Sequence, residues 1–172
     1  MDEVERLLNV IPEGTFKSLF VAYLNTGARR NELLPPSFKW DNINLKEKRI
    51  YLRGKGDKER YVPMTPTVVK LLLDRLSEGL KFPFKYGQDH VSHRLREYYK
   101  EAGIENANLH TFRKTFGSLL IQEGFADIYK VSKLLGHSSV KVTERHYIHL
   151  IDENYQASIN GLDNIIDNLV ES

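Results

Sequence analysis

Apolar residues recur at helical spacing along much of the chain. Phe16, Leu19, Phe20, Tyr23 and Leu24 stand at i, i+3, i+4, i+7 and i+8, so they share one face of a helix. A glycine follows three residues later, and glycine is a common residue just past a helix C-terminus. The pattern therefore predicts an amphipathic helix with one buried face and an end near residue 27.

A threonine followed by proline at 65–66 predicts the start of another helix, because threonine is a good N-cap and proline suits the first helical position. We expect Val69, Leu72, Leu73 and Leu76 to face the core from that helix. Comparable patterns predict helices over residues 88–101, 111–122, 127–135 and 139–146.

One region has the alternation of strands instead. Residues 49–53 alternate between polar and apolar, and so do residues 60–62, with the turn-forming sequence Gly-Lys-Gly-Asp at 54–57 between them. This predicts a β-hairpin with Lys55 at its tip. No internal repeat, low-complexity tract or linker interrupts the chain. We expect a mainly α fold with a small antiparallel β-hairpin or three-stranded sheet, that is, an α+β domain.

The composition is that of one globular domain of 172 residues, with 41% hydrophobic and 28% charged residues. The absence of cysteine excludes disulfides, thiolate metal sites and cysteine nucleophiles. No apolar run reaches the roughly 20 residues of a membrane helix, and no signal-peptide pattern begins the sequence. We expect a cytoplasmic protein with no membrane partner.

The small net charge of +2 hides an uneven distribution. No lysine or arginine follows Arg145, whereas five acidic residues do. Residues 1–151 therefore hold 25 basic against 18 acidic residues, a balance of +7, and residues 152–172 carry −5. A basic body favours a polyanionic partner. We expect 1–151 to be the functional domain and 152–172 to be an acidic amphipathic tail helix.

Three short stretches carry residues with chemical potential. The first is Thr26–Leu33, in which Arg29 and Arg30 directly follow the predicted helix stop. A chain reversal is a good place to present a guanidinium group. The plainer interpretation, favoured for this stretch alone, is a solvated helix start with Glu32 paired to an arginine.

The second stretch is His110–Arg113, whose end residues share one helix face at i, i+3 spacing. His110 also falls near a helix N-terminus, where free backbone N–H groups favour an anion. For an isolated pair of this spacing, two unrelated surface side chains are the simpler interpretation.

The third stretch places His137 directly after a helix-ending glycine, with Tyr147 ten residues later. A tyrosine half-buried by its ring is the simpler interpretation of Tyr147. His146 and His149 have i, i+3 spacing but no well-placed acidic third ligand, so no metal site is expected. P-loop, GxGxxG and G-x-S-x-G sequences are absent.

Taken together and in this order, the stretches resemble the tyrosine recombinase family, the phage-integrase and Xer-type enzymes. The matching motifs are T-G-x-R-x-x-E at 26–32, G-K-G-x-K-x-R at 54–60, H-x-x-R at 110–113, L-G-H at 135–137 and the following Tyr147. They span most of the chain. The resemblance implies the catalytic-domain fold of that family.

The resemblance also implies a role for each matched residue. Arg29, rather than Arg30, matches the first catalytic arginine and Arg113 the second, and two such groups would clamp the oxygens of a phosphodiester. Glu32 looks structural. His137 matches the second histidine, a ligand for a phosphate oxygen.

Proton transfer and attack fall to three further matched residues. Tyr147 is the implied nucleophile, but a phenol with a pKa near ~10 needs help at neutral pH. His110 is the candidate base. Lys55 is the candidate general acid for the leaving 5′-oxygen.

The function implied is site-specific DNA recombination or integration through a 3′-phosphotyrosine, without a cofactor, metal or ATP. Two alternatives remain: relaxation of DNA in the manner of a type IB topoisomerase, and a catalytically silent DNA-binding module of the same fold. The partner is double-stranded DNA, and the resemblance implies a homo-oligomer, a tetrameric synapse, on that DNA. Members usually carry a further N-terminal DNA-binding domain, so this chain is either a catalytic fragment or an unusually minimal protein, and we favour the fragment.

Two surfaces complete the predictions. Arg94, Arg96 and Lys100 lie on a basic helix that is either a DNA-backbone contact or an ordinary solvated face. The acidic tail carries an apolar stripe at Tyr155, Ile159, Leu162, Ile166 and Leu169. The stripe packs either on its own domain or, as the resemblance implies, on a neighbouring protomer.

Overall fold

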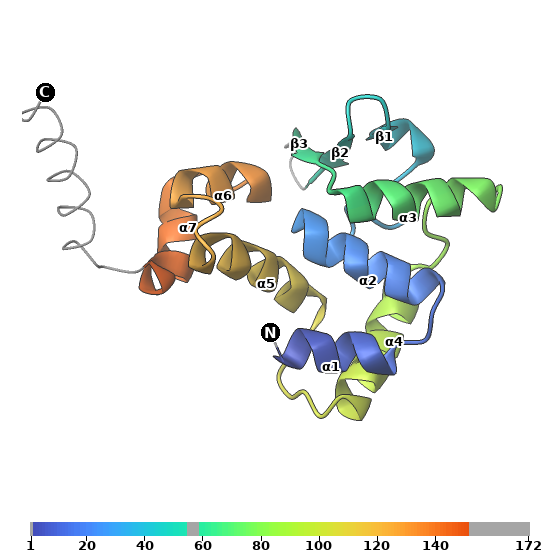
Figure 1. Cartoon of the computed structure of the whole chain (residues 1–172), viewed down its shortest axis with the longest axis horizontal. Coiled ribbons are helices and arrows are strands. Elements are labelled where there is room, and N and C mark those ends of the chain that lie inside the picture. The colour runs from blue at the N-terminus through green and yellow to red at the C-terminus, as the bar shows by residue number, and fades with distance from the viewer. Residues whose placement is uncertain (1, 55–58, 152–172) are drawn as a thin grey trace, which may run out of the picture.

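The computed structural model describes residues 2–54 and 59–151. Lys55 and the tail at 152–172, both subjects of the sequence predictions, lie outside these residues. Most of the described chain is helical (Figure 1). The helices are α1 (Asp2–Val10), α2 (Thr15–Thr26), α3 (Pro66–Ser77), α4 (Gln88–Glu101), α5 (Leu109–Gln122), α6 (Ile128–Leu135) and α7 (Val140–Tyr147), with the short 3₁₀ helices η1 (Trp40–Asn42) and η2 (Ile148–Leu150).

Most of the helices agree closely with those predicted. The predicted start of α3 after Thr65 and the predicted end of α2 near Gly27 are both confirmed. The Thr65 hydroxyl accepts a hydrogen bond from the Val68 amide at the start of α3, as expected of an N-cap. Helix α1, with its acidic first turn, was not predicted. None of the described helices is both long and apolar enough to cross a membrane.

The predicted hairpin belongs to a three-stranded antiparallel sheet of order β1-β2-β3, which confirms the expected mixed fold. The strands are β1 (Ile43–Asn44), β2 (Arg49–Arg53) and β3 (Glu59–Pro63). In the register, Ile50 pairs with Val62 and Leu52 with Arg60. These four side chains are buried, so the sheet turns this face to the body of the protein.

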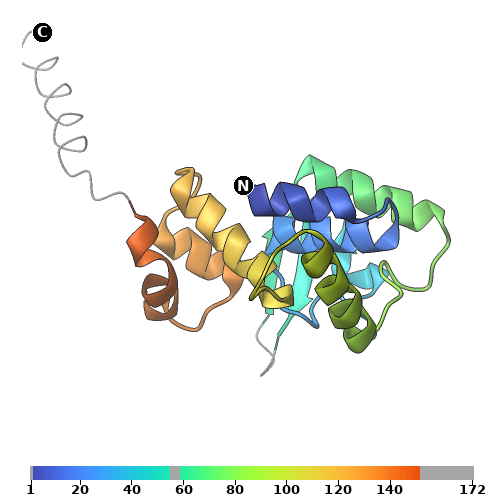
Figure 2. The same cartoon turned by 90° about the horizontal axis from the view of Figure 1, so that it is seen from below.

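Two apolar cores lie on either side of the site described below. The larger core joins the sheet to α1–α4, and the smaller one joins α5, α6 and α7 (Figures 1 and 2). Helix α5 spans both, because Phe112 packs in the first core and Phe116 in the second. Arg113 lies between these two phenylalanines in the sequence and therefore at the junction of the cores.

Gly27 allows the two parts to approach each other at the end of α2. It has φ of +59°, in the left-handed region that suits glycine. A Cβ atom at this position would collide with the ring of Phe116 and lie 2.9 Å from Leu135 Cδ2. The helix stop predicted from the sequence is thus also a close contact between α2, α5 and α6.

One prediction about the core is wrong. Leu73 and Leu76 of α3 are 48% and 45% exposed, and the buried face carries Val68, Leu72 and Arg75 instead. An arginine is tolerated there because its Nε and Nη1 find hydrogen-bond partners, although its buried Nη2 has none among the described residues. Its guanidinium donates hydrogen bonds to the Pro83 carbonyl, the Thr15 hydroxyl and the Glu78 carboxylate.

Candidate active site

Five of the six residues expected to be catalytic line one cavity of about 210 Å³. They come from four places in the fold: the turn after α2, helix α5, the turn after α6, and the end of α7. The sixth, Lys55, lies outside the described residues. The cavity is lined by Arg29, His110, Arg113, Lys114, His137, Val142, His146 and Tyr147.

Arg29 is oriented by fixed acceptors. Its Nη1 donates to Glu32 Oε1 at 2.9 Å and its Nη2 to the Gly136 carbonyl at 3.0 Å. Its backbone amide donates to Glu32 Oε2 at 2.6 Å. Because the side chain is still 35% exposed, the guanidinium is held in place and remains accessible from the cavity.

Glu32 is buried and paired with a second arginine that the sequence interpretation did not single out. Arg60 of β3 donates from Nη1 and Nη2 to the two carboxylate oxygens at 2.8 and 2.7 Å. Burial alone would raise the pKa of Glu32, but the Arg60 bonds outweigh it and hold the pKa at about 2. The only signal for Arg60 in the sequence is its place at the end of the hairpin motif.

Three arginines converge on the C-terminal end of α6, at the carbonyls of residues 134–136. Arg60 Nε donates to the first at 2.8 Å, Arg113 Nη2 to the second at 2.6 Å, and Arg29 Nη2 to the third at 3.0 Å. Carbonyls at a helix C-terminus carry partial negative charge and need partners. This arrangement fixes the turn that carries His137 against both candidate catalytic arginines.

Arg113 is almost fully buried, with 3% of its surface exposed. It is anchored at both ends of its fork, because Nη1 donates to the Gly27 carbonyl at 2.8 Å while Nη2 bonds the end of α6. Burial, followed by the charge of Arg29, lowers the pKa of Arg113 to about 10. The group therefore stays charged at neutral pH, and its remaining N–H donors are available to an anion.

Two of the three histidines that line the cavity, His110 and His137, are held in their neutral form at pH 7. Burial and then the charge of Arg113 lower the pKa of His110, and the same causes lower that of His137 to about 4. His137 Nδ1 lies 2.7 Å from the hydroxyl of the buried Thr143, which orients the ring. The sequence interpretation missed Thr143. The Asn108 side chain caps α5 by accepting from the His110 amide at 2.8 Å.

Tyr147 is buried, with 4% of its surface exposed, and packs in the smaller core at the floor of the cavity. Its ring lies so close to Gly117 of α5 that a Cβ atom there would be 2.7 Å from the phenolic oxygen. Burial raises the pKa of Tyr147, and the charge of Arg113 opposes this. The phenol is therefore protonated at neutral pH and needs an acceptor before it can attack.

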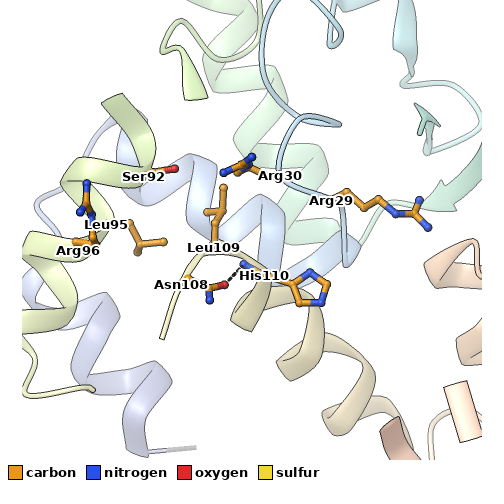
Figure 3. Close-up of a pocket in the computed structure, with 8 residues that line it drawn as sticks. All are labelled: Arg29, Arg30, Ser92, Leu95, Arg96, Asn108, Leu109 and His110. Carbon is orange, nitrogen blue, oxygen red and sulfur yellow. Dashed lines mark hydrogen bonds between the residues drawn. The ribbon is translucent and has the colours of Figure 1, made fainter. Parts of the chain in front are cut away.

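A larger cleft of about 620 Å³ (Figure 3) adjoins the cavity. Arg29 and His110 line both hollows. Of the basic residues expected to contact DNA, Arg96 lines this cleft. Arg94 instead donates to Glu97 and to the Tyr98 hydroxyl, and Lys100 is exposed in the last turn of α4. Within residues 2–54 and 59–151, no three His, Asp or Glu side chains gather where a metal ion could be held.

Residues 1–154 match the model of the Phage integrase family. The chain belongs to this family. The matched residues include every described residue that lines the candidate active site.

The curated proteins to which this chain is similar include Xer tyrosine recombinases. The chain is 30% identical to tyrosine recombinase XerC of Caldanaerobacter subterraneus, covering 93% of this chain and 49% of the relative. It is 33% identical to XerD of Listeria monocytogenes, with 84% and 55% covered. The chain thus spans about half the length of the curated relatives it matches.

Among solved structures, the fold is similar to the crystal structure of XerA recombinase. The TM-score is 0.73 at 28% identity, and the match covers 93% of this chain and 61% of that one. The post-cleavage complex of XerH with a palindromic difH substrate has the same fold, with a TM-score of 0.70. These likenesses support the mainly helical fold with its small sheet.

Proposed function

We propose that this chain cleaves and rejoins double-stranded DNA at specific sites through a 3′-phosphotyrosine on Tyr147. The observation that carries the proposal is the cavity in which a buried phenol shares its walls with Arg29, Arg113 and two neutral histidines. The described lining of that cavity holds no carboxylate. It is therefore suited to an anionic reacting group.

The two arginines supply the electrostatic part of this reaction. Charge on the non-bridging oxygens of a phosphodiester must be stabilised in the transition state. Arg29 and Arg113 are already oriented by backbone carbonyls and Glu32, so little reorganisation is needed when the phosphate arrives. His137, with its Nδ1 engaged by Thr143, offers its other ring nitrogen to a phosphate oxygen.

Proton transfer follows from the protonation states. Tyr147 loses its proton to neutral His110 as the phenolic oxygen forms a bond to phosphorus. The bond from phosphorus to the 5′-oxygen breaks, and Lys55 donates a proton to that oxygen. A 5′-hydroxyl reverses these steps and rejoins the strand. Because one phosphodiester linkage replaces another at every step, the cycle needs neither ATP nor a metal ion.

The partner and the assembly are also part of the proposal. The Xer relatives are named tyrosine recombinases, and recombination requires that two DNA duplexes be cut and exchanged. We propose that residues 1–151 act on duplex DNA and that the chain works as a homo-oligomer, a tetramer in the synapse. The uneven charge agrees with this, since the domain carries +7 over residues 1–151.

The proposal is tested by trapping the covalent intermediate. The protein is incubated with a pool of nicked duplexes of randomised sequence, in which the short fragment beyond the cleavage point diffuses away, and adducts are resolved on a denaturing gel. We expect an adduct with the wild type and with Tyr155→Phe, and none with Tyr147→Phe. An adduct that survives in Tyr147→Phe, or none with the wild type, contradicts the proposed function.

A further inference from the structure

The first turn of helix α5 has its polar groups tied to one another. The Asn108 side chain accepts from the His110 amide at 2.8 Å, the bond drawn as a dashed line in Figure 3. The Asn108 amide in turn donates to the Thr111 hydroxyl at 3.0 Å. A reciprocal capping box of this kind satisfies amides that would otherwise lack partners at the helix start. It therefore holds the backbone of His110, the second residue of the helix.

Tyr99 of α4 holds the same turn from a neighbouring helix. Its hydroxyl donates to the Asn108 carbonyl at 3.2 Å, and that carbonyl also accepts from the Thr111 amide at 2.9 Å. Burial raises the pKa of Tyr99 to about 12, so the hydroxyl remains a donor throughout the pH range in which histidine titrates. The start of α5 thus has a fixed attachment to α4.

The ring of Tyr99 adds a second contact. It stacks on Phe112 with the ring centroids 6.4 Å apart, and Phe112 also stacks on Phe20 of α2 at 5.4 Å. Phe112 stands between His110 and Arg113 in the sequence. The first turn of α5 is therefore held between α2 and α4 at the point where it carries His110.

We propose that Asn108 and Tyr99 are positioning residues that keep the His110 imidazole in the catalytic cavity, where it accepts the proton of Tyr147. The described lining of that cavity includes neither of them, so each acts through the backbone of the first turn of α5. This role rests on the proposed function in that His110 is the proton acceptor. Helix ends fray when their amides lack partners, and a frayed first turn would let the imidazole leave the cavity.

The surroundings of His110 make this positioning measurable. Basic side chains from three parts of the fold line the same cavity, namely Arg113 and Lys114 of α5, His146 of α7, and Arg29 after α2. Partial burial, followed by the charge of Arg113 and then of the other three groups, lowers the pKa of His110. An imidazole that leaves the cavity for water loses these effects, so its pKa should rise toward 6.5.

The test is an NMR titration of the protein with labelled histidine side chains, without DNA. We expect the midpoint of His110 to rise toward 6.5 in Asn108→Ala. It should rise less in Tyr99→Phe, which keeps the buried ring and loses only the hydroxyl. Asn108→Ser retains a neutral N-cap and should stay close to the wild type. The midpoint of His137, whose ring is oriented by Thr143, should remain at about 4 in every variant.

Thr65→Ala is the matched control. Thr65 caps α3 by accepting from the Val68 amide, and the described lining of the catalytic cavity includes no residue of α3. This variant also loses an N-cap, so a general loss of stability would affect it too. We expect His110 to keep its wild-type midpoint in Thr65→Ala. The proposal is overturned if Asn108→Ala and Tyr99→Phe both titrate like the wild type, or if Thr65→Ala raises the midpoint as much as Asn108→Ala.

The rate of adduct formation at saturating DNA provides a second readout. In Asn108→Ala the rate should fall roughly tenfold or more, because a general base acts only from the correct position. The rise of this rate with pH should also move upward together with the midpoint of His110, and Asn108→Ser should recover most of the rate. A variant that is merely less stable would give less adduct at the wild-type rate and pH dependence. That result for Asn108→Ala would overturn the proposal.

The NMR titration does not depend on catalysis. If the midpoint of His110 moves as expected but the wild type forms no adduct, Asn108 and Tyr99 do hold His110 and the proposed function fails. If the wild type forms the adduct but the midpoint is unchanged in both variants, the positioning role fails alone.

Discussion

Two neutral histidines in a cavity rich in positive charge connect this site to the stability of the protein. In the unfolded chain His137 has its ordinary pKa of 6.5, whereas in the folded protein the pKa is about 4. Between these values the unfolded state binds a proton that the folded state does not. The free energy of unfolding must therefore fall as the pH is lowered from about 6.5 to about 4.

Urea unfolding measured across this pH window checks the effect. His137→Gln should show a shallower fall than the wild type, although His110, whose pKa is also lowered, keeps part of it. His93→Gln is the control, since His93 is an exposed histidine of α4. Glu32 adds to the pH dependence only below about pH 4.5, because its pKa is 4.5 in the unfolded chain and about 2 in the folded protein. Its stabilising effect is lost as the pH falls between these values. Equal pH dependence of His137→Gln and wild type would contradict this account.

Among individual residues, the sequence predicted most of the lining of the candidate site, because motif order and spacing are local properties. The structure brings Arg29 and Tyr147 into one cavity although 118 positions separate them in the sequence. The side chains of Arg29 and Arg30 point in different directions (Figure 3), and only Arg29 lines the catalytic cavity. Thr143 was not predicted, because its contact with His137 depends on how α7 folds back on the turn after α6.

The elements around the site are tied together by the buried carboxylate of Glu32. Arg60 links β3 to Glu32 and also to the end of α6. Replacement of Arg60 by leucine would leave the buried Glu32 carboxylate with only Arg29 as an arginine partner. The Leu134 carbonyl would also lose its hydrogen bond from Arg60. Removing one partner of a buried ion pair costs about 3–5 kcal/mol. We expect Arg60→Leu to lose stability in this range and to lower the rate of adduct formation.

Arg49→Leu is the control on the neighbouring strand. Arg49 forms an exposed ion pair with Glu47 at 3.6 Å, and such pairs contribute about 0–1 kcal/mol. Chemical denaturation of both variants measures the difference. Equal losses for Arg60→Leu and Arg49→Leu would show that the link between β3 and α6 does not stabilise the site.

The helices and the hairpin could be predicted because apolar periodicity, caps and turn residues act within a few positions. Their faces were harder to predict. Leu73 and Leu76 were expected in the core, but the buried position is occupied by Arg75, whose partners come from α2 and from the segment after α3. Arg60 was missed as a partner of Glu32 for the same reason. Contacts between distant elements leave no periodic trace in a sequence.

At the scale of the whole molecule, the charge distribution predicts two partners. The basic domain is proposed to bind DNA, while the acidic segment 152–172 carries an apolar stripe that needs a protein surface. Deletion of 152–172 should therefore impair multimer formation on DNA more than it impairs DNA binding. Sedimentation of protein–DNA complexes and anisotropy measure the two effects. Unchanged assembly after the deletion would refute this role.

Tyr147 is proposed to form the covalent bond to DNA, and the sequence makes this bond directly measurable. No lysine or arginine follows Arg145, so trypsin releases residues 146–172 as one peptide that contains both Tyr147 and Tyr155. After nuclease trimming of the trapped adduct, fragmentation in a mass spectrometer locates the nucleotide. We predict a nucleotide attached through its 3′-phosphate to Tyr147, with a free 5′-hydroxyl on the released strand. A nucleotide on Tyr155, or on any other residue, would contradict the account.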